Sequence, residues 1–300
     1  MGIFNRKYLW YKAKFYLDKK SFRGKYFLRR LLMLLKPNIE KGLIVKINSG
    51  FKLKIFPLYD KGIERRLFEN GIYEKGTLKI FNRIIESGYI IIDAGANIGL
   101  MSIHFSRLTG SNGKVFSFEP HPVTFDILKD NININQSTNI YPNQLALGSA
   151  NKKGEIFERL HINRGAASLV NSDNKNGFPI FIEKLDSYIE RKSIKKLNLL
   201  KIDVEGYELE VLKGALKSIK KFKPIICLEY STDVYSQNSP IKIYFLLKEL
   251  NYLVFKQENG KESESGLIEV KVKEELPQHD NLFCFQAFHL NEFAKDIFVS

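Results

Sequence analysis

The chain has few of the residues and segments that mark secreted, membrane-spanning or zinc-binding proteins. Its 300 residues include only two cysteines, Cys227 and Cys284, which lie far apart. They predict neither a disulfide framework nor a metal site. The longest apolar run near the start, Leu31–Leu35, is far shorter than the ~20 residues that span a bilayer. Because no apolar stretch with a small-residue cleavage site marks a secretory signal, we expect a cytoplasmic chain.

Glycine and proline are also scarce, with 20 and 9 residues, while 44% of the chain is hydrophobic and 27% is charged. This balance excludes collagen-like, low-complexity and wholly disordered proteins. The length suits one enlarged α/β domain with an extension.

Acidic residues are almost missing from the first 36 positions, which contain 11 Lys or Arg and only Asp18, a net charge of 11 − 1 = +10. The other 264 residues carry 36 − 32 = +4. We therefore expect residues 1–36 to form a basic helical arm, which ends at Lys36-Pro37 because proline disfavours helix continuation. Three interpretations stay open: a helix packed on the body, peripheral contact with a membrane surface, or nucleic-acid binding. The arm interleaves its charges with aromatic residues: Phe4, Tyr8, Trp10, Tyr11, Phe15, Tyr16, Phe22, Tyr26 and Phe27.

The rest of the chain is predicted to form an N-terminal hairpin and approach segment over 37–76, then a catalytic domain over 77–300. Residues 44–47 and 51–55 flank Asn48-Ser49-Gly50 as two strands flank a turn. From residue 77 helical patterns alternate with unbroken apolar runs, which predicts a doubly wound, mostly parallel sheet. Near the end, 252–255 and 282–285 read as an antiparallel pair joined by a long mobile loop that includes 258–266. The parallel runs cover residues 89–93, 114–119, 197–203 and 224–229.

Carboxylates stand at the ends of these strands. In open α/β sheets ligands bind beyond the carboxyl ends of the strands. We therefore expect an acidic rim, which suits a cationic or hydroxyl-rich ligand and repels bare phosphates. Its members are Asp93, Glu119, Asp203 with Glu205, and Glu229.

The turn after the first of these strands reads Asp93-Ala-Gly95-Ala-Asn97-Ile-Gly99. It is not the three-glycine turn of dinucleotide folds, and an acid just before the first glycine would oppose a pyrophosphate. S-adenosylmethionine has no phosphate and carries a sulfonium and an ammonium group, so Asp93 would favour it. Glu119 ends the next strand, where a carboxylate can accept hydrogen bonds from both ribose hydroxyls. Without Glu119, the same residues would also suit an ordinary tight turn.

Three blocks of the sequence resemble the FkbM family of S-adenosylmethionine-dependent O-methyltransferases. They are Asp93–Gly99, Phe118-Glu119-Pro120 and the stretch L-K-I-D-V-E-G-Y-E at 200–208; Ala146–Gly148 and Gly71–Glu74 are similar too. The resemblance covers roughly residues 60–290. It implies a Rossmann-like class I methyltransferase fold, with a seven-stranded sheet whose last strand is antiparallel. It also implies S-adenosylmethionine as cofactor, with Gly95, Asn97, Gly99 and Glu119 as its cradle and Glu74 closing the pocket.

The third block has a physical reading of its own. Residues i, i+2 and i+4 of an extended chain share a face, so Lys201, Asp203 and Glu205 point the same way if the strand reaches that far. Two neighbouring acids raise one pKa, which gives a carboxylate suited to proton abstraction. We predict these three as catalytic residues, with the acids as base, hydroxyl anchor or metal ligand; a structural ion cluster is the alternative. Glu208 and Glu210 are expected to cap the following helix.

Other polar residues are weaker candidates. Gln144, near the third strand end, is predicted to hydrogen-bond adenine. His121 is a candidate for the adenine pocket and His161 for an acceptor-side base, whereas His104 is expected to be packed.

Together these observations predict an S-adenosylmethionine-dependent O-methyltransferase that acts on a hydroxyl of a glycan, glycolipid or related metabolite. One alternative is an RNA methyltransferase whose arm holds phosphates. It is disfavoured because the fourth strand ends in D-V-E-G rather than the Asn/Asp-Pro-Pro-Tyr/Phe of base-methylating enzymes. The other alternative is a non-catalytic, membrane-associated binding protein.

Overall fold

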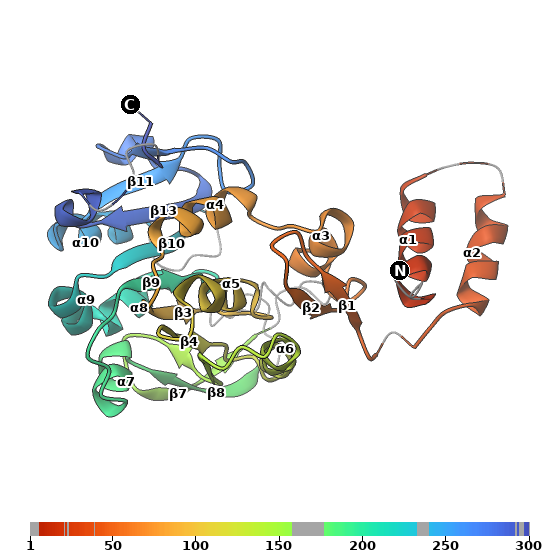
Figure 1. Ribbon diagram of the computed structural model, residues 1–300, viewed down its shortest axis with the longest axis horizontal. Coiled ribbons are helices and arrows are strands. Elements are labelled where there is room, and N and C mark those ends of the chain that lie inside the picture. Colours follow the sequence, from red (N-terminus) through yellow and green to blue (C-terminus); the bar gives the residue numbers. More distant parts are fainter. Residues whose placement is uncertain are drawn as a thin grey trace.

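The computed structural model describes residues 6–20, 22, 24–38, 40–157, 177–232, 240–291, 293 and 297–299. Within them the chain forms an α/β body with a helical hairpin at its N-terminal end (Figure 1). Phe4 and His161, both singled out from the sequence, lie outside the described residues. None of the described helices combines the length and apolar character needed to cross a membrane.

The body is built on an eight-stranded sheet with the order β12-β11-β13-β10-β9-β3-β4-β5. The five strands β10, β9, β3, β4 and β5 run parallel, and β13 is antiparallel to both of its neighbours. The predicted seven-stranded sheet with an antiparallel last strand is therefore confirmed, with the short β12 added at one edge. The strands are β3 (Ile90–Ala94), β4 (Lys114–Phe118), β5 (Ile140–Asn143), β9 (Leu199–Ile202), β10 (Ile225–Ser231), β11 (Leu253–Gln257), β12 (Leu267–Glu269) and β13 (His279–Phe285).

Helices cover both faces of this sheet because its strands are apolar on both sides. Ile91 and Ile92 of β3, for example, belong to the two opposite hydrophobic clusters. One face carries α4 (Lys75–Ile84), α5 (Leu100–Thr109) and α6 (Pro122–Ile134). The other carries α7 (Leu185–Arg191), α8 (Glu208–Gly214), α9 (Leu216–Phe222) and α10 (Ile241–Glu249). Two 3-10 helices lie at Lys273–Glu275 and Ala287–Asn291, and a small sheet holds β6 (Ala146–Leu147), β8 (Phe178–Glu183) and β7 (Lys152–Ile156).

The N-terminal arm is two helices, not the one predicted: α1 (Arg6–Lys19) and α2 (Lys25–Leu34). Gly24, at φ 86°, precedes α2 in a left-handed conformation that ends any continuous helix. The indole of Trp10 donates a 2.7 Å hydrogen bond to the carbonyl of Leu32 and so ties the two helices together.

Helix α1 packs on the body through α3 (Ile63–Asn70). The rings of Tyr8, Tyr11 and Phe15 lie 5.1, 5.6 and 5.5 Å from the ring of Phe68. For α1 this agrees with the interpretation of a helix packed on the body. The predicted hairpin is confirmed as β1 (Leu43–Lys46) and β2 (Lys52–Ile55), which pair antiparallel. The division into 1–36, 37–76 and 77–300 stays a prediction.

The pair β11 and β13 is antiparallel, as predicted, but the segment 258–266 after β11 is not the free loop expected from its polarity. The carbonyl of Lys261 accepts hydrogen bonds from the N–H groups of Gly76 and Thr77, at 3.0 and 3.3 Å. Glu262 pairs with Arg66 at 2.8 Å. The segment is thus bound to the start of α4 and to α3.

Candidate active site

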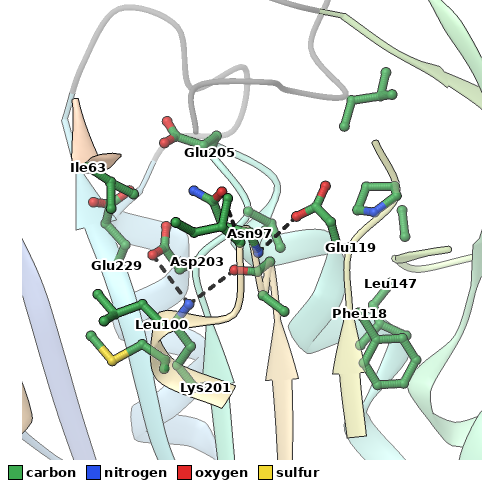
Figure 2. Close-up of a pocket in the computed structure, with 18 of the residues that line it drawn as sticks. Ile63, Asn97, Leu100, Phe118, Glu119, Leu147, Lys201, Asp203, Glu205 and Glu229 are labelled. Carbon is green, nitrogen blue, oxygen red and sulfur yellow. Dashed lines mark hydrogen bonds and ion pairs between the residues drawn. The ribbon is translucent and has the colours of Figure 1, made fainter. Parts of the chain in front are cut away.

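The pocket with the most predicted site residues lies beyond the carboxyl ends of β3, β4, β9 and β10 (Figure 2). About 1020 Å³ inside it is free of atoms, and part of this space is open solvent. Seven predicted residues line it: Glu74, Gly95, Asn97, Glu119, Lys201, Asp203 and Glu205. Asp93, Gly99 and Gln144 do not belong to its lining.

The glycine turn is shaped by protein neighbours rather than by space for a ligand. A Cβ on Gly95, where φ is 78°, would lie 1.7 Å from the carbonyl oxygen of Asp203. A Cβ on Gly99, where φ is 94°, would meet Leu128 of α6 at 2.7 Å. The first glycine therefore lets the β3 and β9 ends approach each other, and the second permits close helix packing.

Glu119 is held in a fixed orientation at the pocket wall. Its carboxylate accepts the N–H of Asn97 on one oxygen and the N–H of His121 on the other, both at 2.9 Å. Burial raises the pKa of Glu119 to about 7, although these two donors oppose the shift. Each carboxylate oxygen has a second lone pair, so the group can also accept two ligand hydroxyls.

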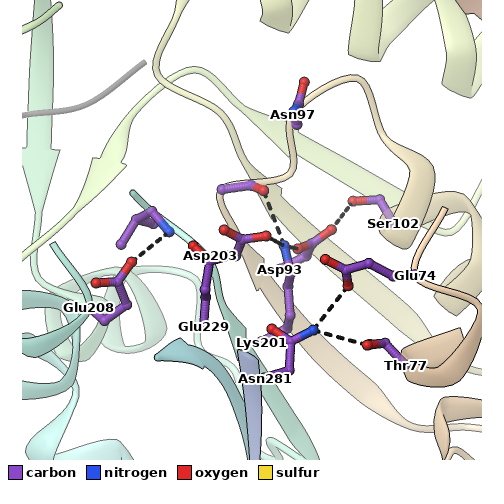
Figure 3. Close-up of polar contacts among 12 residues, drawn as sticks. Glu74, Thr77, Asp93, Asn97, Ser102, Lys201, Asp203, Glu208, Glu229 and Asn281 are labelled. Atoms are coloured by element: carbon purple, nitrogen blue, oxygen red, sulfur yellow. Dashed lines mark hydrogen bonds and ion pairs between the residues drawn. The ribbon is translucent and has the colours of Figure 1, made fainter. Parts of the chain in front are cut away.

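Lys201 lies beneath the turn as a buried cation (Figure 3). Its Nζ lies 3.3 Å from Asp93 and 3.4 Å from Asp203, and it donates to the carbonyl of Gly95 at 3.2 Å. Burial alone would lower the pKa of Lys201, but the two carboxylates outweigh it and raise the pKa. Asp93 is fully buried and also accepts the Ser102 hydroxyl. Direct contact between Asp93 and a cofactor is not what this geometry favours, and its influence would pass through Lys201.

Asp203 and Glu205 come together by a turn rather than by an extended strand. Strand β9 stops at Ile202, and Glu205 adopts a left-handed conformation with φ 54°. Glu208 holds this turn, because its carboxylate accepts the N–H groups of Val204 and Gly206 at 3.2 and 3.0 Å. We expected an extended strand to point Asp203 and Glu205 the same way. The strand ends before both residues, and the turn brings them to the pocket lining instead.

Glu229, two residues before the end of β10, completes the acidic group. One carboxylate oxygen from each of Asp203, Glu205 and Glu229 lies within 4.8 Å of the others. Burial raises the pKa of Glu229, and the charge of Asp203 raises it further, while Lys261 opposes both. A neighbouring acid therefore does raise a pKa at this site, that of Glu229.

Two residues of the site were missed from the sequence. Lys261 places its Nζ 2.9 Å from Glu229 and 3.4 Å from Glu74. Asn281 donates to the Glu74 carboxylate at 3.0 Å (Figure 3). Burial raises the pKa of Glu74 to about 7 even beside Lys261. The sequence did indicate that an acidic rim of this size needs more than one positively charged partner. It did not indicate which lysine would be the second partner.

Other candidates lie elsewhere. Gln144 is exposed between β5 and β6, so its contact with adenine stays a prediction without support from the pocket lining. His121 caps α6, where its Nδ1 accepts the N–H of Thr124. His104 is packed, as expected, and burial lowers its pKa to about 4. Glu208 and Glu210 both lie in the first turn of α8, as expected, but the hydrogen bonds that Glu208 accepts come from the turn before the helix.

Comparison with known proteins places the fold and the pocket in context. The methyltransferase FkbM domain matches residues 93–254, which is 162 of the 300 residues. The chain belongs to the FkbM methyltransferase family. The match spans the glycine turn, Glu119 and the whole 200–208 block, whereas Ile63, Tyr73 and Glu74 of the pocket lining lie before it.

Two relatives of this FkbM chain are each 30% identical to it. Hexuronic acid methyltransferase AglP of Haloferax volcanii matches over 154 residues, 51% of this chain and 61% of that protein. Methyltransferase sdnD of Sordaria araneosa matches over 166 residues, 43% of this chain and 61% of that protein. This FkbM chain thus spans about three fifths of the length of these relatives.

Solved structures are similar at lower identity. An FkbM methyltransferase from Methylobacillus flagellatus is 15% identical, with a TM-score of 0.43, over 91% of this chain and 57% of that one. Fibrillarin of Aeropyrum pernix, solved with S-adenosyl-L-methionine, is 10% identical with a TM-score of 0.43, over 80% of this chain and 92% of that one.

The methyl donor of the family is S-adenosylmethionine, and the residues present fit it. Glu119 has the spare acceptor positions that a ribose diol needs, and it lies at the strand end where the turn leaves backbone exposed to the pocket. The acidic wall complements the two positive charges of the donor. A dinucleotide pyrophosphate would meet the same carboxylates at a cost.

Proposed function

We propose that this chain transfers a methyl group from S-adenosylmethionine to a hydroxyl group of a glycan, glycolipid or related metabolite. The observation that carries the proposal is the division of one pocket into two acidic sides. Figure 2 draws Glu119 on one side of Asn97, with Asp203, Glu205 and Glu229 on the other. The first side suits a ribose diol and the second suits an acceptor hydroxyl.

The chain's own residues would hold both reactants and remove one proton. When bound, S-adenosylmethionine supplies an electrophilic methyl group on a positively charged sulfur. Glu119 fixes the ribose, and the acidic group opposite orients the acceptor hydroxyl toward the methyl carbon, because such positioning contributes much of the rate. Asp203 or Glu205 accepts the hydroxyl proton as the new bond to oxygen forms, since a protonated alcohol is a poor nucleophile.

Two observations favour a sugar as the acceptor. One relative is named as a hexuronic acid methyltransferase. A second cavity shares Tyr73 with the pocket and is lined by Lys61, Arg66 and Lys261 among others. This adjoining space can take further sugar units, because its polar lining offers hydrogen-bond partners for their hydroxyl groups.

The test has two stages. Calorimetric titration with S-adenosylhomocysteine measures donor binding, and a panel of neutral and uronic-acid glycans is then screened for methyl-dependent mass gain. Among Asp203→Asn and Glu205→Gln, the variant that lacks the base should lose about 100-fold or more in turnover, with little change in S-adenosylhomocysteine affinity. Asp126→Asn, an exposed acid on α6 paired with Lys129, is the matched control.

The outcomes separate the parts of the proposal. Full turnover in both acid variants contradicts the assignment of the base. An absence of S-adenosylhomocysteine binding contradicts the donor, and methylation of RNA but of no glycan contradicts the acceptor class.

A further inference from the structure

Helix α2 exposes an apolar face that nothing else in the described part of the chain covers. None of its residues is buried. Phe27, Leu31 and Leu34 follow helical i, i+4, i+7 spacing, and they are 70%, 47% and 83% exposed. Exposed leucine and phenylalanine side chains occur singly on most proteins, whereas a contiguous stripe marks an interaction site.

The opposite side of α2 accounts for its fixed position. Leu32 packs against the hydrophobic core, and its carbonyl accepts the Trp10 indole N–H of α1. Arg29 pairs with Asp18 of α1. Because these contacts hold one side of α2 on α1, the Phe27 stripe faces away from the body. Figure 1 draws α2 as the outermost element, with α1 between it and α3.

Positive charge accompanies the apolar stripe. Arg30 lies three residues after Phe27 and four before Leu34, so it borders the stripe, whereas Lys25 and Arg29 fall on the side toward α1. No acidic residue lies in α2, and the single acid of the arm, Asp18, is already paired with both Lys14 and Arg29. The outward face is therefore apolar along its centre and bordered by the Arg30 cation, on an arm whose first 36 residues carry a net charge of +10.

We propose that α2 docks on an anionic phospholipid surface and lies in the plane of the interface. The Phe27, Leu31 and Leu34 side chains enter the boundary between headgroups and acyl chains, while Arg30 contacts lipid phosphates. A nucleic acid would leave the apolar stripe without a partner. A second copy of this chain would bring an equally cationic helix against it, whereas an anionic bilayer complements both features.

The test uses the full chain and vesicles of phosphatidylglycerol with phosphatidylcholine, compared with vesicles of phosphatidylcholine alone. Cosedimentation should be strong with the first, weaker with the second, and reduced by salt. Arg30→Gln should weaken binding to the anionic vesicles about fivefold, because each cation near such a surface contributes roughly fivefold. Leu31→Ser/Leu34→Ser should weaken binding to both kinds of vesicle by about tenfold or more.

A matched double variant on another helix controls for general effects. Lys242 and Phe245 are exposed on α10, so Lys242→Gln/Phe245→Ser removes one cation and one apolar side chain far along the chain from the arm. It should bind as the wild type does. Circular dichroism and urea unfolding confirm that each variant folds, which the exposure of the substituted residues leads us to expect.

Several results would overturn the proposal. They are a wild type that ignores anionic vesicles, α2 variants that bind as well as the α10 control, and a wild-type dimer that the Leu31→Ser/Leu34→Ser change makes monomeric. None of these results depends on methyl transfer, so the membrane proposal can fail without contradicting the proposed activity, and the reverse.

Discussion

The charged side chains of this site neutralise one another, and the ion pair of Lys201 shows this most directly. Its ammonium is the ion-pair partner of Asp93, which is fully buried. Lys201→Met should lower the free energy of unfolding by about 3–5 kcal/mol, because it leaves a buried charge uncompensated. Urea denaturation measures the loss, and the double variant Asp93→Asn/Lys201→Met should recover part of it. A double variant less stable than Lys201→Met alone would contradict this view of the pair.

Glu119 gives a prediction for ligand binding. Its pKa is raised to about 7, and only the ionised carboxylate can accept from both ribose hydroxyls while keeping its two backbone donors. S-adenosylhomocysteine affinity should therefore rise with pH up to about 7 and then level off. Calorimetry between pH 5 and 8 measures the dissociation constant. It should rise by at most about tenfold for each unit by which the pH falls below the pKa of Glu119. Glu119→Gln should bind S-adenosylhomocysteine more weakly, and its affinity should depend less on pH. If the pH dependence were unchanged, a group other than Glu119 would cause it.

For single residues, the sequence predicted the carboxylates of the site better than the cations that pair with them. Asp203, Glu205 and Glu119 could be predicted because strand ends in a parallel sheet converge on one edge. Asp93 ends a strand in the same way, but its carboxylate is engaged with Lys201 and Ser102 inside the body. Lys261 could not be predicted, because it lies in the long connection after β11. The residue pattern of that connection does not reveal where it runs in the fold.

Among the elements, the turn after β3 is the one most constrained by close approach. A Cβ on Gly95 would lie 1.7 Å from the carbonyl of Asp203, whereas a Cβ on Gly88 would meet nothing within 4 Å, although both glycines have φ near 80°. Gly88→Ala should cost about 1–2 kcal/mol for its left-handed backbone alone. Gly95→Ala should cost clearly more and should also weaken S-adenosylhomocysteine binding. Urea denaturation and calorimetry on both variants check this, and equal losses would show that steric contact adds nothing.

Element types could be predicted well, but their ends and breaks could not. The strands follow from unbroken apolar runs and the hairpin from two short runs around a turn. The arm was predicted as one helix because its basic and aromatic residues continue across residues 20–24, so composition hid the break that Gly24 makes. The 258–266 segment was predicted to be mobile because polar composition does not reveal its contacts with Gly76 and Arg66.

For the whole molecule, the buried glutamates set how stability depends on pH. Burial raises the pKa values of Glu74, Glu119 and Glu208 to about 7, above their ordinary value of 4.5. Between these values the three glutamates bind more protons in the folded chain than in the unfolded chain. His104 and His289 oppose them below pH 6.5, because burial lowers their pKa values to about 4. Three groups outweigh two, so the free energy of unfolding should fall as pH rises from about 4.5 to 7. Each group contributes at most about 1.4 kcal/mol per pH unit. Urea denaturation of the ligand-free protein at several pH values measures this slope, and stability that rises over this range would contradict it.

The origin of the counter-charges also bears on how the protein is made. Glu74 comes from the first third of the chain, whereas Lys261 and Asn281, which bind its carboxylate, come from the last fifty residues. A nascent chain still on the ribosome can form the central strands and the glycine turn, but it holds these acids without their partners. Synthesis must therefore have passed Asn281 before this corner of the molecule acquires its final electrostatic balance.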